Sequence, residues 1–292
     1  MDQLHHGHHV RLRSPVRGVY LHADEDGHGV SLHGRRDLMN VACAVHLVEG
    51  QDAHYLHLHS AAYGRYLAST TAPAPLGHRG LRVEQPNYNH TDETALVWLA
   101  ILSDSGDEVL LQHFNGRFLR ANGRYLPWND GASVDYISDI HQVSTMMHWV
   151  VEDVPAREAM PPLPPPTGLP FPAAMAPSRV ITYAWRSFHG DLLTSGTIVF
   201  RGRSVFCLRE ELARRLVVGA LALANLGVDD IVMCLPTRDG RLFPLLVDLP
   251  NSRQSLHVAI AITKTPSESP FLLFSFGKKL LFAIAVFILS GC

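Results

Sequence analysis

The sequence predicts an all-β N-terminal domain followed by a smaller α+β domain. A six-residue phrase that starts with glycine occurs three times, at Gly18, Gly64 and Gly116, and repetition at about 50 residues is typical of a fold built from repeated units. Residues 155–177 contain nine prolines, which block helices and central strands and therefore separate two domains. After this segment a helical spacing of apolar residues occurs between strand-like runs.

Each copy of the phrase follows a short run that suits a half-buried strand, at residues 10–13, 56–59 and 109–112. The glycine permits the positive φ of a hairpin, and the Tyr/Phe-Leu pair after it begins the return strand. A third apolar strand is expected to close each repeat, at residues 41–48, 95–102 and 147–151. Threefold repetition of short strands, without a helical period, predicts a β-trefoil over residues 1–154.

Equivalent positions in the three repeats suggest how this domain packs. The aromatic residue of the phrase is Tyr20, Tyr66 or Phe118, and we expect these three rings to be buried together around the pseudo-threefold axis or next to it. In the third strands Trp98 and Trp149 hold matching places, and Cys43 holds the corresponding place in repeat 1.

The second half has the pattern of a ubiquitin-like β-grasp. Runs at residues 180–185 and 197–200 predict a hairpin. Residues 205–216 place apolar side chains at steps of three and four, which predicts a helix with Ser204 as its N-cap. Strands are expected at 231–235, 242–246 and 256–262. We therefore divide the chain into a trefoil at 1–154, a proline-rich linker at 155–177, an α+β domain at 178–274 and an atypical apolar tail at 275–292.

Several of these segments resemble known families. The phrase Gly-x-Tyr/Phe-Leu-x-Ala resembles the fascin-like, actin-cross-linking trefoils. Residues 120–123, followed by Leu126-Pro127-Trp128, resemble the plant family of the domain of unknown function 569, as do residues 10–14. Residues 200–204, 208–213 and 239–245 resemble the ubiquitin-like module that is often joined to that trefoil. The resemblance implies a fascin-like trefoil and an interaction module, and it carries no established activity.

Charge and composition narrow the classes of partner. Residues 1–154 contain 11 Arg, no Lys and 18 Asp plus Glu, a net charge of −7, which argues against binding to nucleic acid. The cysteines at positions 43, 207, 234 and 292 lack metal or disulfide spacing. The first residues lack an apolar signal core, and the apolar run at 280–289 is too short to span a bilayer. We expect no stable membrane insertion and a cytoplasmic location, with a nuclear one as the alternative; the oligomeric state stays open.

No catalytic motif, phosphate loop or dinucleotide fingerprint occurs in the sequence, so we expect neither an enzyme nor a cofactor. His57 and His59 would share one strand face, but no third ligand is fixed to them, so we expect no metal site. The candidate binding residues are Trp128, which lies in a polar loop, and three arginines near the N-terminus: Arg11, Arg13 and Arg17.

The resulting expectation is a non-enzymatic interaction or scaffold protein with a protein partner. Actin is the candidate partner, on the fascin resemblance. The alternative is a trefoil that binds a carbohydrate or another small ligand, although the Q-x-W triplet of ricin-type lectins does not occur in the sequence.

Overall fold

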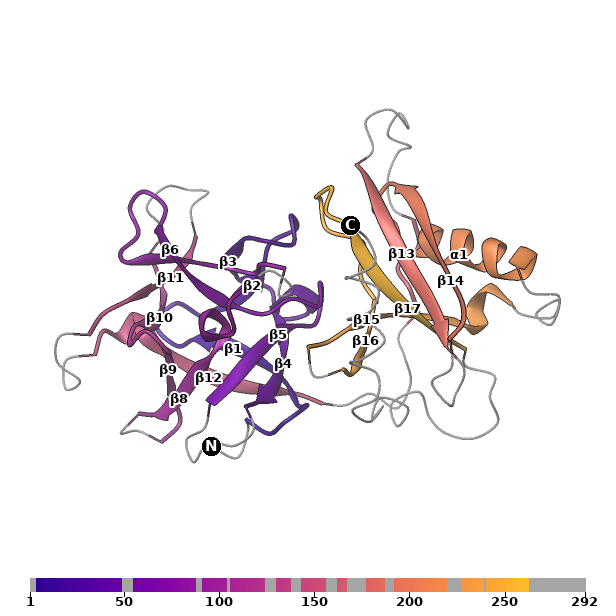
Figure 1. The fold of residues 1–292 in the computed structure, drawn as a ribbon. Helices are drawn as coiled ribbons and strands as arrows, with labels where there is room; N and C mark the ends of the chain where they lie inside the picture. The colour runs from indigo at the N-terminus through magenta and orange to yellow at the C-terminus, as the bar shows by residue number, and fades with distance from the viewer. Residues whose placement is uncertain are drawn as a thin grey trace. The chain divides into compact units, whose positions relative to one another are not determined.

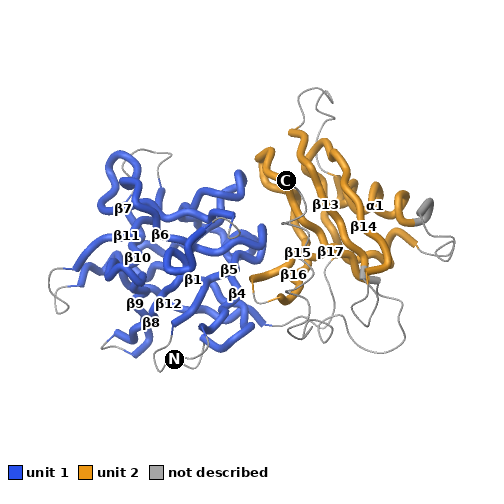
Figure 2. The backbone as a smooth tube through the Cα atoms, in the orientation of Figure 1, with its two compact units in different colours: residues 1–160 blue, residues 161–292 orange. Residues whose placement is uncertain are grey.

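The computed structural model describes residues 4–48, 55–87, 91–103, 106–123, 130–137, 143–155, 162–166, 177–186, 192–219, 227–238 and 240–262. The chain divides into two compact units, residues 1–160 and 161–292 (Figure 2). The apolar tail expected at 275–292 and most of the proline-rich linker lie outside the described residues.

Unit 1 consists of short strands in three sets of four (Figure 1). The first set is β1 His9–Ser14, β2 Val19–Ala23, β3 Val30–His33 and β4 Ala42–Leu47. The second is β5 Tyr55–Ser60, β6 Ala68–Pro73, β7 Leu81–Glu84 and β8 Trp98–Leu102. The third is β9 Val109–His113, β10 Phe118–Ala121, β11 Ala132–Asp135 and β12 His148–Val154.

The first and last strands of the three sets close into a barrel. Among the described residues, antiparallel pairing runs from β1 through β4, β5, β8, β9 and β12 and returns to β1. The other strands form the hairpins β2–β3, β6–β7 and β10–β11. These hairpins meet one another where β7 pairs with β11 and where Gly29 bridges to Glu84. This arrangement is a β-trefoil, which confirms the predicted fold of the N-terminal half.

The strands that close each repeat begin later than the sequence predicts. A 3₁₀ turn stands immediately before the strand in each case: Met39–Val41, Glu93–Leu96 and Thr145–Met147. In repeats 2 and 3 a side chain caps the turn, because Asp92 and Ser144 accept hydrogen bonds from the backbone two residues later. The predicted runs therefore begin with the last one or two residues of the turn.

The phrase aromatics are buried, but they do not meet at the axis as expected. Tyr66 packs with Ala68 and Leu96, and Phe118 packs with Leu110 and Met147, in two separate clusters. Neighbouring residues of a strand face opposite sides, and the leucine that follows each aromatic takes the inner side. Leu67 and Leu119 thus belong to the central core.

Unit 2 is an α+β domain whose sheet has the order β14-β13-β17-β15-β16. Its strands are β13 Ser178–Arg186, β14 Leu192–Arg201, β15 Ile231–Pro236, β16 Leu242–Pro244 and β17 Leu256–Ile262. Helix α1, Val205–Gly219, packs its predicted apolar stripe into the core, and Ser204 Oγ accepts a 3.3 Å hydrogen bond from the Cys207 amide. With β13 parallel to β17, the domain is ubiquitin-like, as predicted. Leu163, from the described part of the linker, packs against the same core.

Candidate functional site

Two buried tryptophans tie the barrel to its hairpins. In repeat 2 the indole Nε1 of Trp98 donates a 3.0 Å hydrogen bond to the carbonyl oxygen of Leu67. In repeat 3 Trp149 Nε1 donates a 3.1 Å bond to the carbonyl oxygen of Leu119. Both acceptors are the leucines of the repeated phrase, so the two bonds are equivalent under the threefold pseudosymmetry.

Cys43 takes the tryptophan position in repeat 1. Strand register shows this, because Cys43 pairs with Val10 as Trp98 pairs with Leu56 and as Trp149 pairs with Val109. The Cys43 thiol contacts the carbonyl oxygen of Val10 at 3.6 Å. Burial raises the pKa of this thiol to about 12, so it stays protonated and unreactive at neutral pH.

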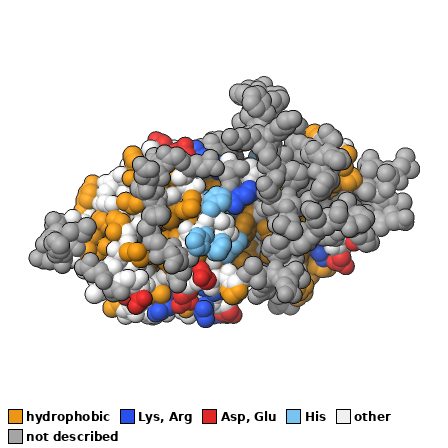
Figure 3. Space-filling view, turned by 90° about the horizontal axis from the view of Figure 1, so that it is seen from below, with side chains coloured by type: hydrophobic (Ala, Val, Ile, Leu, Met, Phe, Trp, Pro, Cys, Tyr) orange, Lys and Arg blue, Asp and Glu red, His pale blue; other side chains and the backbone are white. Residues whose placement is uncertain are grey.

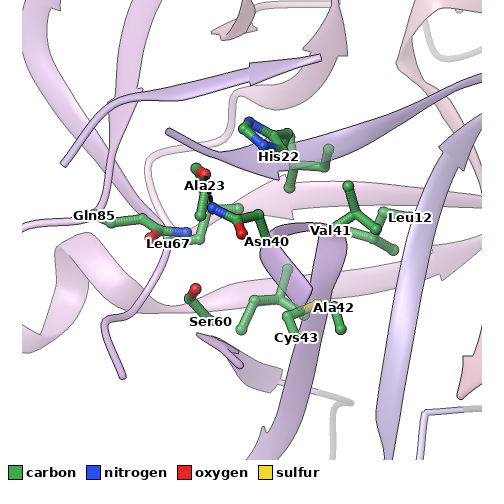
Figure 4. A pocket seen from close by; sticks show the side chains of 12 residues that line it. Leu12, His22, Ala23, Asn40, Val41, Ala42, Cys43, Ser60, Leu67 and Gln85 are labelled. Carbon is green, nitrogen blue, oxygen red and sulfur yellow. Dashed lines mark hydrogen bonds between the residues drawn. The ribbon is translucent and has the colours of Figure 1, made fainter. Parts of the chain in front are cut away.

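A cavity lies beside Cys43 (Figure 4). It offers about 20 Å³ to the centres of water molecules, enough for about one or two of them. Apolar walls come from Leu12, Leu21, Val41, Leu58 and Leu67. Polar side chains come from His22, Asn40, Ser60 and Gln85. In the sequence, the only sign of this cavity is that Cys43 stands where the other two repeats have tryptophan.

The polar residues of the cavity differ in how they are bonded. Asn40 Nδ2 donates to the carbonyl oxygen of Ala23 at 2.8 Å and to the Tyr63 hydroxyl at 3.2 Å. Gln85 is 7% exposed, and among the described residues its Oε1 has no hydrogen-bond partner. Figure 4 shows Gln85, Asn40 and Ser60 turned toward the same space. The cavity therefore presents one unsatisfied acceptor.

Next to the cavity, hairpin β2–β3 brings a histidine, an aspartate and a serine together, but not as a catalytic triad. Ser31 Oγ donates to Asp24 Oδ1 at 2.5 Å, and His22 Nδ1 lies 3.3 Å from both partners. A triad needs the serine and the carboxylate on opposite ring nitrogens of the histidine. Here both face the same nitrogen and the hydroxyl is bonded to the carboxylate, so this cluster cannot activate the serine.

Two exposed aromatic rings lie in or beside the turn between β9 and β10. Phe114 is 62% exposed and Tyr136, just after β11, is 58% exposed. The guanidinium of Arg117 lies over the Tyr136 ring, 4.1 Å from its centre. The turn of repeat 2 is different, because Ala61, Ala62 and Tyr63 are buried there. Sequence reasoning missed this pair, since exposure at a turn depends on what packs over it.

Histidine side chains gather at the surface (Figure 3). In repeat 1 the exposed His6 lies 6.0 Å, ring to ring, from the buried His46, which stacks on His59 at 5.1 Å. His46 Nδ1 also lies 3.0 Å from the Tyr66 hydroxyl. Among the residues that the structure describes, no group of three or more His, Cys, Asp or Glu is arranged to hold a metal ion.

Within the described part of the chain, no helix has the length and apolarity to cross a membrane.

The arginines singled out from the sequence lie on or beside strand β1, and two of them are engaged inside the trefoil. Arg13 Nε pairs with Glu152 at 2.8 Å. Arg17 pairs with Asp130 at 2.8 Å and donates to the carbonyl oxygen of Asn122. Arg11 is half-buried. The positive charges of Arg13 and Arg17 are therefore partly neutralised by neighbouring carboxylates. Trp128, the fourth candidate, lies outside the described residues.

The fold and these sites define a two-module protein, a β-trefoil joined to a ubiquitin-like domain. Residues 1–152 match the family described as a beta-trefoil domain of unknown function (DUF569), and the chain belongs to that family. Residues 177–261 match the DUF569 associated ubiquitin-like domain. No curated protein matches the chain.

Solved structures are similar to about half of the chain. The SDF2-like protein from Arabidopsis thaliana is 16% identical with a TM-score of 0.44, covering 51% of this chain and 94% of its own. A ricin B-like lectin of Macrolepiota procera, in complex with lactose, is 17% identical with a TM-score of 0.40, covering 51% and 98%. The designed threefold protein ThreeFoil is 17% identical with a TM-score of 0.39, covering 50% and 99%. Identities this low concern the fold alone.

Proposed function

We propose that this protein is a non-enzymatic binding protein whose trefoil holds a partner protein at the turn between β9 and β10. The observation that carries the proposal is the exposure of Phe114 and Tyr136 beside Arg117. Aromatic residues and arginine are enriched in protein interfaces and dominate their binding energy. Phe114 directly follows β9 and Tyr136 directly follows β11, so strands hold the backbone of both residues and less conformational entropy is lost on binding.

Other features of the chain support a binding role without catalysis or a cofactor. The serine, histidine and aspartate of hairpin β2–β3 are arranged wrongly for acyl transfer. The net charge of −7 over residues 1–154 opposes nucleic-acid binding. We also propose a cytoplasmic or nuclear location, without stable insertion in a membrane.

Actin is the partner class that the fascin resemblance favours. Filamentous actin is acidic, and the trefoil is acidic too, so their long-range interaction is repulsive at neutral pH. Because Arg13 and Arg17 are already paired with carboxylates, we expect actin to contact the turn between β9 and β10, around Arg117. Co-sedimentation of the full chain with filamentous actin at pH 7.5 and pH 6 tests this partner. The amount of protein that sediments with the filaments should be higher at pH 6 than at pH 7.5. No co-sedimentation at either pH excludes actin as the partner.

The hairpin itself is tested by mutation. Full-length wild type, a Phe114→Ala/Tyr136→Ala double variant and a Leu76→Ala control are compared as baits in lysate. Leu76 is 80% exposed and is not part of the hairpin, so its loss controls for a general decrease in surface apolarity. A protein retained by wild type and the control, but lost from the double variant, supports the proposal. Equal retention by all three baits contradicts it.

A carbohydrate ligand is the second candidate. The specific observation in its favour is that the exposed rings lie beside polar side chains, including Asn115 and Asp135. Flat rings next to hydrogen-bonding groups also suit the mixed apolar and polar faces of a sugar. A glycan array probed with wild type and the Phe114→Ala/Tyr136→Ala variant decides between the two candidates. Retention of wild type alone on the array favours the carbohydrate.

A further inference from the structure

We infer that the repeat 1 cavity is a hydration site, in which one or two water molecules lie beside the place that tryptophan takes in the other two repeats. The inference is independent of the proposed function and begins from the threefold comparison. Two repeats join strand and hairpin through an indole N–H that donates to the phrase leucine. In repeat 1 the equivalent leucine, Leu21, and the equivalent of the indole, Cys43, both line the cavity.

The chemistry of the walls favours water over an empty space. Cavities that stay dry are lined by apolar side chains alone, whereas a buried water needs about two to four polar partners. Gln85 Oε1 is buried and lacks a partner among the described residues, and Ser60 contributes a hydroxyl on another side of the cavity. A water molecule that donates to Gln85 Oε1 removes the cost of burying an unbonded acceptor.

The cavity is small. About 20 Å³ for the centres of water molecules corresponds to about one or two waters. Leu12, Leu58 and Leu67 on its walls belong to the packed barrel core, so widening it would disturb that core. Water is therefore the ligand class that both the volume and the polar groups select.

The hydration site changes how hairpin β2–β3 is attached to the barrel. In repeats 2 and 3 a covalently fixed indole makes the bond. In repeat 1 Cys43 takes the place of the indole, and Asn40 reaches the hairpin through its bond to the carbonyl oxygen of Ala23.

Magnetic relaxation dispersion of water oxygen counts long-lived internal waters in solution. We compare wild type, Cys43→Met and Cys43→Ala, all as the full chain. Methionine is flexible and fills irregular gaps, so Cys43→Met should lose at least one long-lived water. Cys43→Ala removes the thiol without filling the cavity and should keep the wild-type count. Equal counts in wild type and Cys43→Met overturn the inference.

A crystal structure of the wild-type chain provides a test that does not depend on how the variants fold. Water density within hydrogen-bond distance of Gln85 Oε1 supports the inference. An empty cavity, in a crystal that shows other buried waters, overturns it, and so does density for an organic ligand. Loss of hairpin binding in the Phe114→Ala/Tyr136→Ala variant does not bear on either result, so the two proposals fail separately.

Discussion

The indole of Trp149 and the backbone carbonyl of Leu119 are 30 residues apart in sequence and are joined by a 3.1 Å hydrogen bond. Both residues lie in the central core of the trefoil. The bond holds the last strand of repeat 3 against the return strand of its own hairpin. Its counterpart in repeat 2 joins Trp98 to Leu67.

Replacing Trp149 by Phe should destabilise the trefoil. The Leu119 carbonyl loses the indole donor in a buried place, which costs about 1–3 kcal/mol, and the smaller ring leaves a cavity that adds to this loss. Urea denaturation followed by circular dichroism measures the change. Tyr136→Phe, at an exposed position, is the control and should change stability by less than about 0.5 kcal/mol. Equal midpoints for Trp149→Phe and wild type would show that the indole bond contributes nothing.

Two thiols should resist modification in the native protein. Burial raises the pKa of Cys43 and of Cys234 to about 12, so the reactive thiolate is scarce at pH 8. Treatment with a disulfide reagent, followed by mass mapping, should leave both residues unlabelled, and labelling should follow when urea unfolds the chain. Rapid labelling of Cys43 in the native protein would mean that the repeat 1 core opens readily.

Stability should fall when the pH drops below about 6.5. Burial, followed by the charges of His22 and Arg35, lowers the pKa of His33, while Asp37 raises it weakly. A lowered pKa means that the unfolded chain takes up the proton first, so this contribution to stability is complete at higher pH and is lost on acidification. Urea midpoints at pH 7.5 and 5.5 measure the loss.

A His33→Gln variant should show a smaller difference between the two midpoints. His33 Nδ1 accepts a 3.1 Å hydrogen bond from the Arg35 amide, and protonation of this nitrogen removes the acceptor. Glutamine keeps an acceptor and does not titrate. An unchanged pH dependence in the variant would assign the effect to other histidines.

Removing the Glu152 carboxylate should lower the stability of the trefoil more than removing an average surface carboxylate. It accepts from Arg13 Nε at 2.8 Å and pairs with Arg36 Nε at 2.9 Å. Glu152→Ala leaves Arg13 without this partner beside the β1–β12 pairing and should cost about 1 kcal/mol, since the pair is partly exposed. Asp37→Asn breaks the exposed Arg35–Asp37 pair and should leave the urea midpoint unchanged. A larger loss in Asp37→Asn would contradict this ranking.

The sequence predicted the two modules because their periodicities are local. Glycines with positive φ occur at Gly18, Gly64 and Gly116, and the helix stripe from Val205 to Leu216 is buried. The side on which the phrase aromatic lies could not be deduced from the repeat. Either member of the Tyr/Phe-Leu pair is apolar enough for the centre, and the choice between them depends on packing with residues far away in sequence.

The candidate site was harder to predict from sequence. The exchange of tryptophan for Cys43 was visible as a break in the repeat, but the cavity beside it depends on Gln85, which comes from a different repeat. The contact of Arg117 with the Tyr136 ring likewise joins residues that are not adjacent in sequence. From the sequence alone, Arg13 and Arg17 look like unpaired basic residues. Their acidic partners, Glu152 and Asp130, are more than 100 positions away.

The packing of Leu163 on the core of unit 2 has a practical consequence for dividing this protein. A fragment that starts at residue 177, where the ubiquitin-like match begins, lacks this side chain. Such a fragment exposes apolar surface that the full chain covers, and exposed apolar surface promotes self-association. A fragment that starts at Pro161 keeps the leucine. The part of the proline-rich segment around Leu163 thus belongs to the second module, and a fragment of that module should include it.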